Sequence, residues 1–177
     1  MFYRIIILVG LILVCAAGQI SLLGGLPWAV SLLNLPLLLL LFLILTSENY
    51  IYLWLAWTAG FCLDAVSFLP FGLYSTTYLA SALAGQVLLK HFFTNRSLYT
   101  FAVLGALTIL FFNLFFFLLR NFISLALENF QFFLAPVFWL ELGLSAIVNG
   151  LAMVVVFYGY HFFPSRFSAA GRKKAIF

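Results

Sequence analysis

Apolar residues form six long blocks along the chain, separated by short stretches of polar and turn-forming residues. The blocks cover residues 5–23, 28–45, 50–69, 71–93, 98–119 and 136–162. A transmembrane helix needs about 20 apolar residues, and each block is close to that length. The apolar positions are continuous rather than alternating, which favours helices over the strands of a membrane barrel. The pattern predicts an all-α, polytopic membrane protein: a bundle of six transmembrane helices in one domain, residues 1–177.

The interruptions between the blocks have the composition of tight turns. Glycine, proline and polar residues occur in the segments 24–27, 47–49, 69–70 and 94–96. Connections this short place consecutive helices side by side and antiparallel.

Charged residues make up only 7% of the chain, and the six blocks leave no room for a soluble catalytic or ligand-binding domain. Lysine and arginine in short loops mark the cytoplasmic side. With the N-terminus inside, only Arg120 falls outside, and seven basic residues fall inside: Arg4, Lys90, Arg96, Arg166, Arg172, Lys173 and Lys174. We therefore expect both termini in the cytoplasm. The net charge of +4 is explained by this orientation and by contact with the lipid bilayer, without nucleic acid.

The first block resembles a signal peptide, because Arg4 precedes an apolar run and small residues occupy 15–18. We favour a retained first span, since the apolar run continues to residue 23 and further spans follow. Cys15 and Cys62 both lie inside predicted helices, where a thiol usually packs as a small hydrophobe. No disulfide, metal or cofactor is expected.

The connection 120–135 is longer than the others and mixes apolar with polar residues, from Phe122 and Leu125 to Asn121 and Glu128. It has two interpretations. It is either an amphipathic segment lying at the outer membrane interface or a surface on which a partner docks.

Two carboxylates, Asp64 and Glu141, lie inside predicted spans, where a charge costs about 2.5–3.5 kcal/mol on insertion scales. Each is about five residues from the outer end of its span, so both lie roughly 7–9 Å below the outer boundary. Arg120, Asn113 and Gln19 could complete a polar cluster at this depth. Either Asp64 or Glu141 pairs with Arg120 and locks helices together, or the cluster binds a ligand or a proton. The chain offers no nucleophile with a base, no paired aspartates and no histidine-rich motif, so we do not expect an enzyme.

The most specific string runs from residue 59 to residue 73. Gly60 lies one helical turn before Asp64 and leaves backbone room beside the carboxylate. Pro70 fixes φ, and Gly72 tolerates the unusual dihedral angles of a tight corner. We expect Asp64 to be held near a rigid corner between two helices.

This Gly-x-x-x-Asp on a central span, followed about eight residues later by a glycine that opens the next span, resembles the MreD family of bacterial rod shape-determining proteins. The small size, the six spans, Pro36 in the second span and the short basic C-terminal tail agree with that family. The resemblance implies a non-enzymatic subunit of the bacterial cytoplasmic membrane that acts in cell-wall elongation and peptidoglycan synthesis. Its implied partners are an MreC-like bitopic membrane protein and, through it, MreB, RodA and a penicillin-binding transpeptidase.

The MreD fold is similar to that of the substrate-binding subunits (S-components) of energy-coupling-factor vitamin transporters, which supplies an alternative function. A vitamin-binding subunit needs an outer cavity with several polar contacts, and only Asp64, Glu141, Arg120 and Asn113 could supply them. The first span lacks the Ala-x-x-x-Ala face through which such subunits dock on their transmembrane partner. This difference favours the scaffold function.

Overall fold

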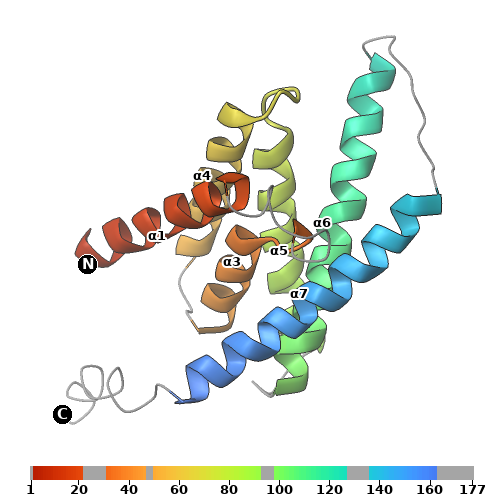
Figure 1. Cartoon of the computed structure of the whole chain (residues 1–177). Helices are drawn as coiled ribbons and strands as arrows, with labels where there is room; N and C mark the ends of the chain where they lie inside the picture. Colours follow the sequence, from red (N-terminus) through yellow and green to blue (C-terminus); the bar gives the residue numbers. More distant parts are fainter. Residues whose placement is uncertain (1, 22–30, 47–49, 93–97, 127–135, 163–177) are drawn as a thin grey trace.

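All regular secondary structure in the described part of the chain is α-helical. A computed structural model describes residues 2–21, 31–46, 50–92, 98–126 and 136–162 (Figure 1). It contains no strand in these ranges, so the all-α prediction is confirmed. The helices are α1 (Phe2–Ser21), α3 (Leu35–Thr46), α4 (Ile51–Val66), α5 (Leu73–Phe92), α6 (Leu98–Ala126) and α7 (Pro136–Phe162).

The short helix α3 forms the centre of the fold. It packs against every other described helix, α1, α4, α5, α6 and α7. Its sequence is leucine-rich on all sides, and a helix that is apolar all round belongs in the interior. Leu40 and Leu45 are fully buried, and they join side chains from the surrounding helices in one continuous apolar core.

Consecutive helices pack against each other along the chain, α3 on α4, α4 on α5, α5 on α6 and α6 on α7. The turn between α4 and α5 and the C-terminal end of α6 lie at one end of the molecule, and the C-terminal ends of α5 and α7 lie at the other (Figure 1). The helix α1 is inclined to this bundle, and its N-terminal half extends away from it (Figure 1). The predicted antiparallel arrangement is therefore found for α4, α5 and α6.

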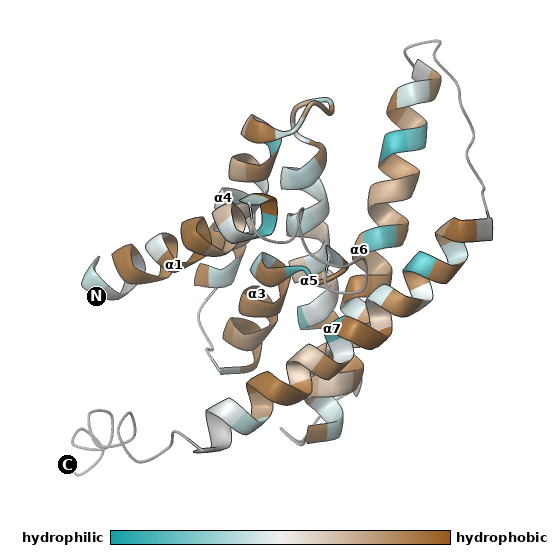
Figure 2. Ribbon diagram, in the orientation of Figure 1, coloured by the Kyte–Doolittle hydropathy of each residue, from teal (hydrophilic) through white to brown (hydrophobic). Residues whose placement is uncertain are grey.

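Hydrophobic residues predominate along α1 and α7, as the brown ribbon segments in Figure 2 show, and many of them face outward. Large side chains on the outward faces of the helices are more than half exposed, among them Val14, Trp54, Leu118, Leu151 and Val155. Two described helices contain stretches long and apolar enough to cross a membrane, Leu98–Leu125 in α6 and Val137–Gly159 in α7. The apolar helices Leu35–Thr46 and Ile51–Val66 are shorter than that.

Two predicted boundaries are wrong. The second block is not one helix, because the chain is non-helical at 32–34 and α3 begins only at Leu35. Residues 120–126 are not part of a separate surface segment, because α6 continues to Ala126. No glycine or proline lies between Leu119 and Ala126, so nothing in the sequence stops the helix at Arg120.

Several sequence predictions fall outside the described residues. These are the second half of the 120–135 connection (127–135), the basic side chain of Arg4, the loop residue Arg96 and the basic C-terminal residues Arg166, Arg172, Lys173 and Lys174.

Candidate functional site

The predicted corner between α4 and α5 has the backbone that its sequence requires. After α4, Ser67 adopts an extended conformation with ψ 149°. Gly72 has φ +97°, the left-handed region in which a side chain is strained. The carbonyl of Gly72 accepts a hydrogen bond from Thr76 N at 3.0 Å, so Gly72 is the residue that opens α5. The expectation that Gly72 takes up unusual dihedral angles is confirmed.

Asp64 caps the N-terminus of α5 from the neighbouring helix. Its Oδ1 accepts a hydrogen bond from Tyr74 N at 2.8 Å, and its Oδ2 accepts from Ser75 N at 3.0 Å. Ser75 Oγ donates a further bond to Oδ2 at 2.5 Å. A capping side chain normally belongs to the residue that opens the helix, but Gly72 has none. Asp64 supplies the missing acceptor, and its negative charge faces the positive end of the helix dipole.

Gly60 allows α5 to approach closely enough for this cap to form. A Cβ atom built at Gly60 would lie 2.7 Å from Ser75 N and 2.9 Å from the carbonyl carbon of Tyr74, and closer still to Ser75 Cα. The room beside the carboxylate that the sequence predicted is therefore occupied by the backbone of α5. Gly60 and Asp64 together form the socket that receives the first turn of that helix.

The expected pairing of Arg120 with Asp64 or with Glu141 is not found among the described residues. Asp64 is 3% exposed, and the polar partners of its carboxylate are the α5 groups just described. Arg120 and Glu141 lie apart from it, along a cavity between α6 and α7. Sequence reasoning missed the true partners because backbone N–H groups have no signature in the residue types.

A second polar centre holds the non-helical residues at 32–34. Pro36 has no N–H to bond the carbonyl of Leu32, so that carbonyl lacks its helical partner. Asn149 Nδ2 of α7 donates to Leu32 O at 2.9 Å. Gln19 of α1 donates from Nε2 to Leu33 O at 2.8 Å, and its Oε1 accepts from Leu35 N at 3.0 Å.

Asn34 links this break to the rest of the bundle. Its N–H donates to Asn149 Oδ1 at 2.9 Å. Its own Oδ1 accepts from Leu37 N at 3.2 Å, which caps α3, and from Tyr78 OH of α5 at 2.7 Å. Sequence reasoning named Gln19 but missed Asn34, Asn149 and Tyr78. The available signal was an asparagine two residues before a proline inside an apolar block, together with a second asparagine in the middle of the last span.

A large cavity lies beside this centre. Its volume is about 1280 Å³. Polar groups line it from five parts of the chain, and aromatic and aliphatic side chains complete its walls. The polar lining residues are Gln19, Ser31, Asn34, Tyr74, Tyr78, Asn113, Arg120, Asn121, Ser124, Glu141 and Ser145. The apolar ones include Leu63, Ile109, Phe112, Phe116, Phe117, Phe138 and Leu142.

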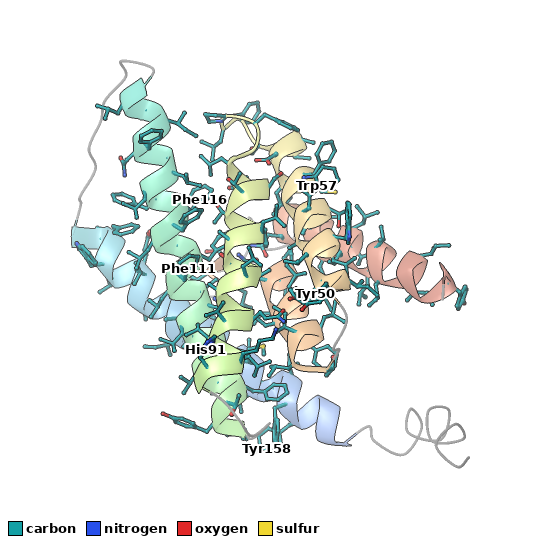
Figure 3. All side chains as sticks on the ribbon, turned by 180° about the vertical axis from the view of Figure 1, so that it is seen from behind. Tyr50, Trp57, His91, Phe111, Phe116 and Tyr158 are labelled. Atoms are coloured by element: carbon teal, nitrogen blue, oxygen red, sulfur yellow. The ribbon has the colours of Figure 1, made fainter. Side chains whose placement is uncertain are left out.

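The helices α6 and α7 are tied together along the cavity. Asn113 Nδ2 donates to Ser145 Oγ at 3.2 Å, and the rings of Phe117 and Phe138 lie 4.4 Å apart between centroids. Figure 3 shows Phe116 on α6 near α5, where its ring centroid lies 4.9 Å from that of Tyr74. The predicted cluster of Gln19, Asn113, Arg120 and Glu141 is thus brought to one cavity, without Asp64.

Comparison of the chain with protein-family models, with curated proteins and with solved structures finds no match.

Proposed function

We propose that this protein is a non-enzymatic, multi-pass subunit of the bacterial cytoplasmic membrane that acts through protein–protein contacts in a cell-wall elongation complex. The observation that carries this proposal is the corner between α4 and α5. Gly60, Asp64 and Gly72, the motif residues that resemble the MreD family, converge on one structural unit in which a buried carboxylate caps the next helix. The motif residues therefore have a structural role, which is to cap and position α5, and this role requires no catalytic group.

The distribution of side chains supports a six-span topology with both termini inside. The apolar outward faces suit hydrocarbon rather than water. Lys90 and His91 lie in the last turn of α5, at the end opposite Arg120. Tyr50, His91 and Tyr158 all lie in the half of the molecule away from the α4–α5 turn (Figure 3). Basic and aromatic residues at one end are typical of a cytoplasmic membrane interface.

The experiment that tests this function is affinity purification of the tagged protein from gently solubilised native membranes, followed by mass spectrometry. We expect an MreC-like bitopic protein, with MreB, RodA and a penicillin-binding transpeptidase recovered through it. Asp64→Leu should still insert but should recover less partner or melt at a lower temperature, because the N–H groups of Tyr74 and Ser75 lose their acceptor. Thr76→Val is the control. If Asp64→Leu recovers as much partner as the wild-type protein and melts at the same temperature, the role given to Asp64 is wrong.

The cavity between α6 and α7 favours a second candidate, the substrate-binding S-component of an energy-coupling-factor vitamin transporter. Such a subunit needs a cavity with convergent polar groups, and Asn113, Arg120 and Glu141 line one here. Recovery of an ATPase pair with a transmembrane coupling subunit in the same purification would select this function over the first.

A further inference from the structure

Two opposite charges line the cavity without neutralising each other. Arg120 projects from α6 and Glu141 from α7 into the same space, yet within the described ranges no ion pair or hydrogen bond joins either residue to another side chain. Opposite charges attract strongly where the dielectric constant is low, and single charges at membrane depth are costly. The space between them is therefore suited to a molecule that carries both charges.

Arg120 and Glu141 lie on the same side of the Asn113–Ser145 contact between α6 and α7. Asn113 and Ser145 are in contact at 3.2 Å. Arg120 is seven residues after Asn113, and Glu141 is four residues before Ser145, so they lie about 10 Å and about 6 Å from that contact along their helices. Both are at the end of the cavity nearer the α4–α5 turn. The charged groups thus form its upper end and the Asn113–Ser145 contact its lower one.

Most of the other polar side chains around the cavity are already hydrogen-bonded within the protein. Gln19 and Asn34 hold the break before α3, Tyr78 donates to Asn34, and Ser145 accepts from Asn113. Binding a ligand through these groups would break the bonds that keep the second block in place. Arg120 and Glu141 make no such hydrogen bonds in the described part of the chain, so they are the groups that select the ligand.

The walls require that the ligand have an apolar body. Phe112, Phe116 and Leu142 face the cavity from α6 and α7. Its volume of about 1280 Å³ exceeds the roughly 300–1,000 Å³ of pockets for drug-sized molecules. The outward faces of the same two helices are apolar at Leu118 and Leu151. The acyl chains of a membrane lipid would fill such a cavity, whereas a water-soluble zwitterion would leave the aromatic wall unfilled.

We propose that this cavity binds one aminophospholipid of the phosphatidylethanolamine class. The phosphate contacts the Arg120 guanidinium, which matches it in charge and in fork geometry. The primary ammonium group donates to the Glu141 carboxylate, and part of the acyl region packs against the aromatic wall. This binding site goes beyond the proposed scaffold role and does not depend on it.

The proposal is tested by native mass spectrometry of the full-length protein released from nanodiscs that contain equal amounts of dioleoyl phosphatidylethanolamine, phosphatidylglycerol and phosphatidylcholine. We expect one phosphatidylethanolamine per chain, retained at least fivefold over the other two lipids. Arg120→Gln should reduce retention of phosphatidylethanolamine at least fivefold. Glu141→Gln should remove the preference for phosphatidylethanolamine over phosphatidylglycerol. Lys90→Gln removes a positive charge from the far end of α5 and should change nothing.

A cavity-filling pair of variants tests the same site without altering charge. Leu142→Trp places a larger side chain in the cavity and should reduce lipid retention, whereas Leu140→Trp, at an exposed position of the same helix, should not. The wild-type protein in detergent should also melt at a higher temperature when phosphatidylethanolamine is added, because a ligand that binds only the folded state stabilises it. This measurement requires no variant to fold.

Equal retention of the three lipids by the wild type would overturn the proposal. So would retention that is unchanged in Arg120→Gln, Glu141→Gln and Leu142→Trp. Release of a water-soluble molecule from the purified protein in place of a lipid would also overturn it, and would support the vitamin-binding function. The two lipid-retention results do not bear on the partner purification, so failure of the lipid site and failure of the scaffold role are distinguishable.

Discussion

Gly60 and Asp64 lie one turn apart on α4 and act on the same two residues of α5. The glycine lets the backbone of Tyr74 and Ser75 approach, and the carboxylate then accepts their N–H groups. A cap of this kind is worth about 0.5–2 kcal/mol, and a buried N–H left without an acceptor costs about 1–3 kcal/mol. The two residues therefore depend on each other.

Gly60→Ala should destabilise the protein by about 1–3 kcal/mol, the usual cost of overpacking, because the new methyl group meets backbone atoms of α5 that have no other place to go. The measurement is the melting temperature in detergent, followed by size-exclusion chromatography of heated samples. Gly143→Ala is the matched control. A Cβ there meets nothing within 4 Å. Because alanine has a higher helix propensity than glycine, by up to about 1 kcal/mol, the Gly143→Ala variant should be at least as stable as the wild-type protein. Equal melting temperatures for the two variants would refute the close approach at Gly60.

The residues of the corner differ in how far the sequence could predict them. Pro70 and Gly72 signal a turn by their own backbone restrictions, so the positive φ of Gly72 was predictable. The partner of Asp64 was not, because the choice between Arg120 and the end of α5 depends on where the helices cross. Arg120 is nearly two turns from the contact that ties α6 to α7, and its distance from Asp64 is set by tertiary packing.

At the scale of elements, the second apolar block shows how a break in an apolar stretch is stabilised. Non-helical backbone at membrane depth is tolerated only where the protein satisfies its polar groups. The carbonyls of Leu32 and Leu33 have partners on α7 and α1, and α3 begins immediately after them. The break and its partners form one unit that three segments of the chain share.

Asn149→Leu should lower the free energy of unfolding by about 1–3 kcal/mol, because Leu32 O and Asn34 N lose a partner that is 1% exposed. Asn121→Leu is the control. The amide of Asn121 donates to Phe117 O of its own helix at 2.9 Å, so we expect a change within about 0.5 kcal/mol. Denaturant unfolding in mixed micelles, followed by tryptophan fluorescence, measures both. If Asn149→Leu and Asn121→Leu lower the free energy of unfolding equally, the break before α3 does not depend on α7.

The six apolar blocks predicted the helices but not all of their boundaries. The last block begins and ends as predicted, at Pro136 and Phe162, because proline is favoured in the first turn of a helix. The second block was misjudged because hydropathy cannot distinguish a continuous apolar helix from one that begins at an internal proline. The extension of α6 to Ala126 was missed because polar residues suggested a loop, whereas Arg120, Asn121 and Ser124 instead face the cavity.

At the scale of the whole molecule, the arrangement of helix ends tests the proposed orientation. In a background with Cys15→Ala and Cys62→Ala, Phe71→Cys lies on the α4–α5 turn at a 68% exposed position. It should react with a membrane-impermeant maleimide in intact spheroplasts. His91→Cys, at the other end of α5, should react only after permeabilisation, because the proposed orientation places it on the cytoplasmic side. Labelling of both positions from the same side would exclude a membrane crossing by α5.

The bonds that hold the two polar centres span very different lengths of chain. Asp64 meets Ser75 only 11 residues away, so that contact can form as soon as α5 leaves the ribosome. Asn34 meets Asn149 across 115 residues, so the break before α3 waits for nearly the whole chain to be synthesised. Until then the carbonyl of Leu32 has no partner on α7. A nascent or truncated chain that lacks α7 therefore keeps an unsatisfied polar group within an apolar segment. The late arrival of Asn149 thus makes synthesis of α7 a condition for satisfying the polar groups of this break.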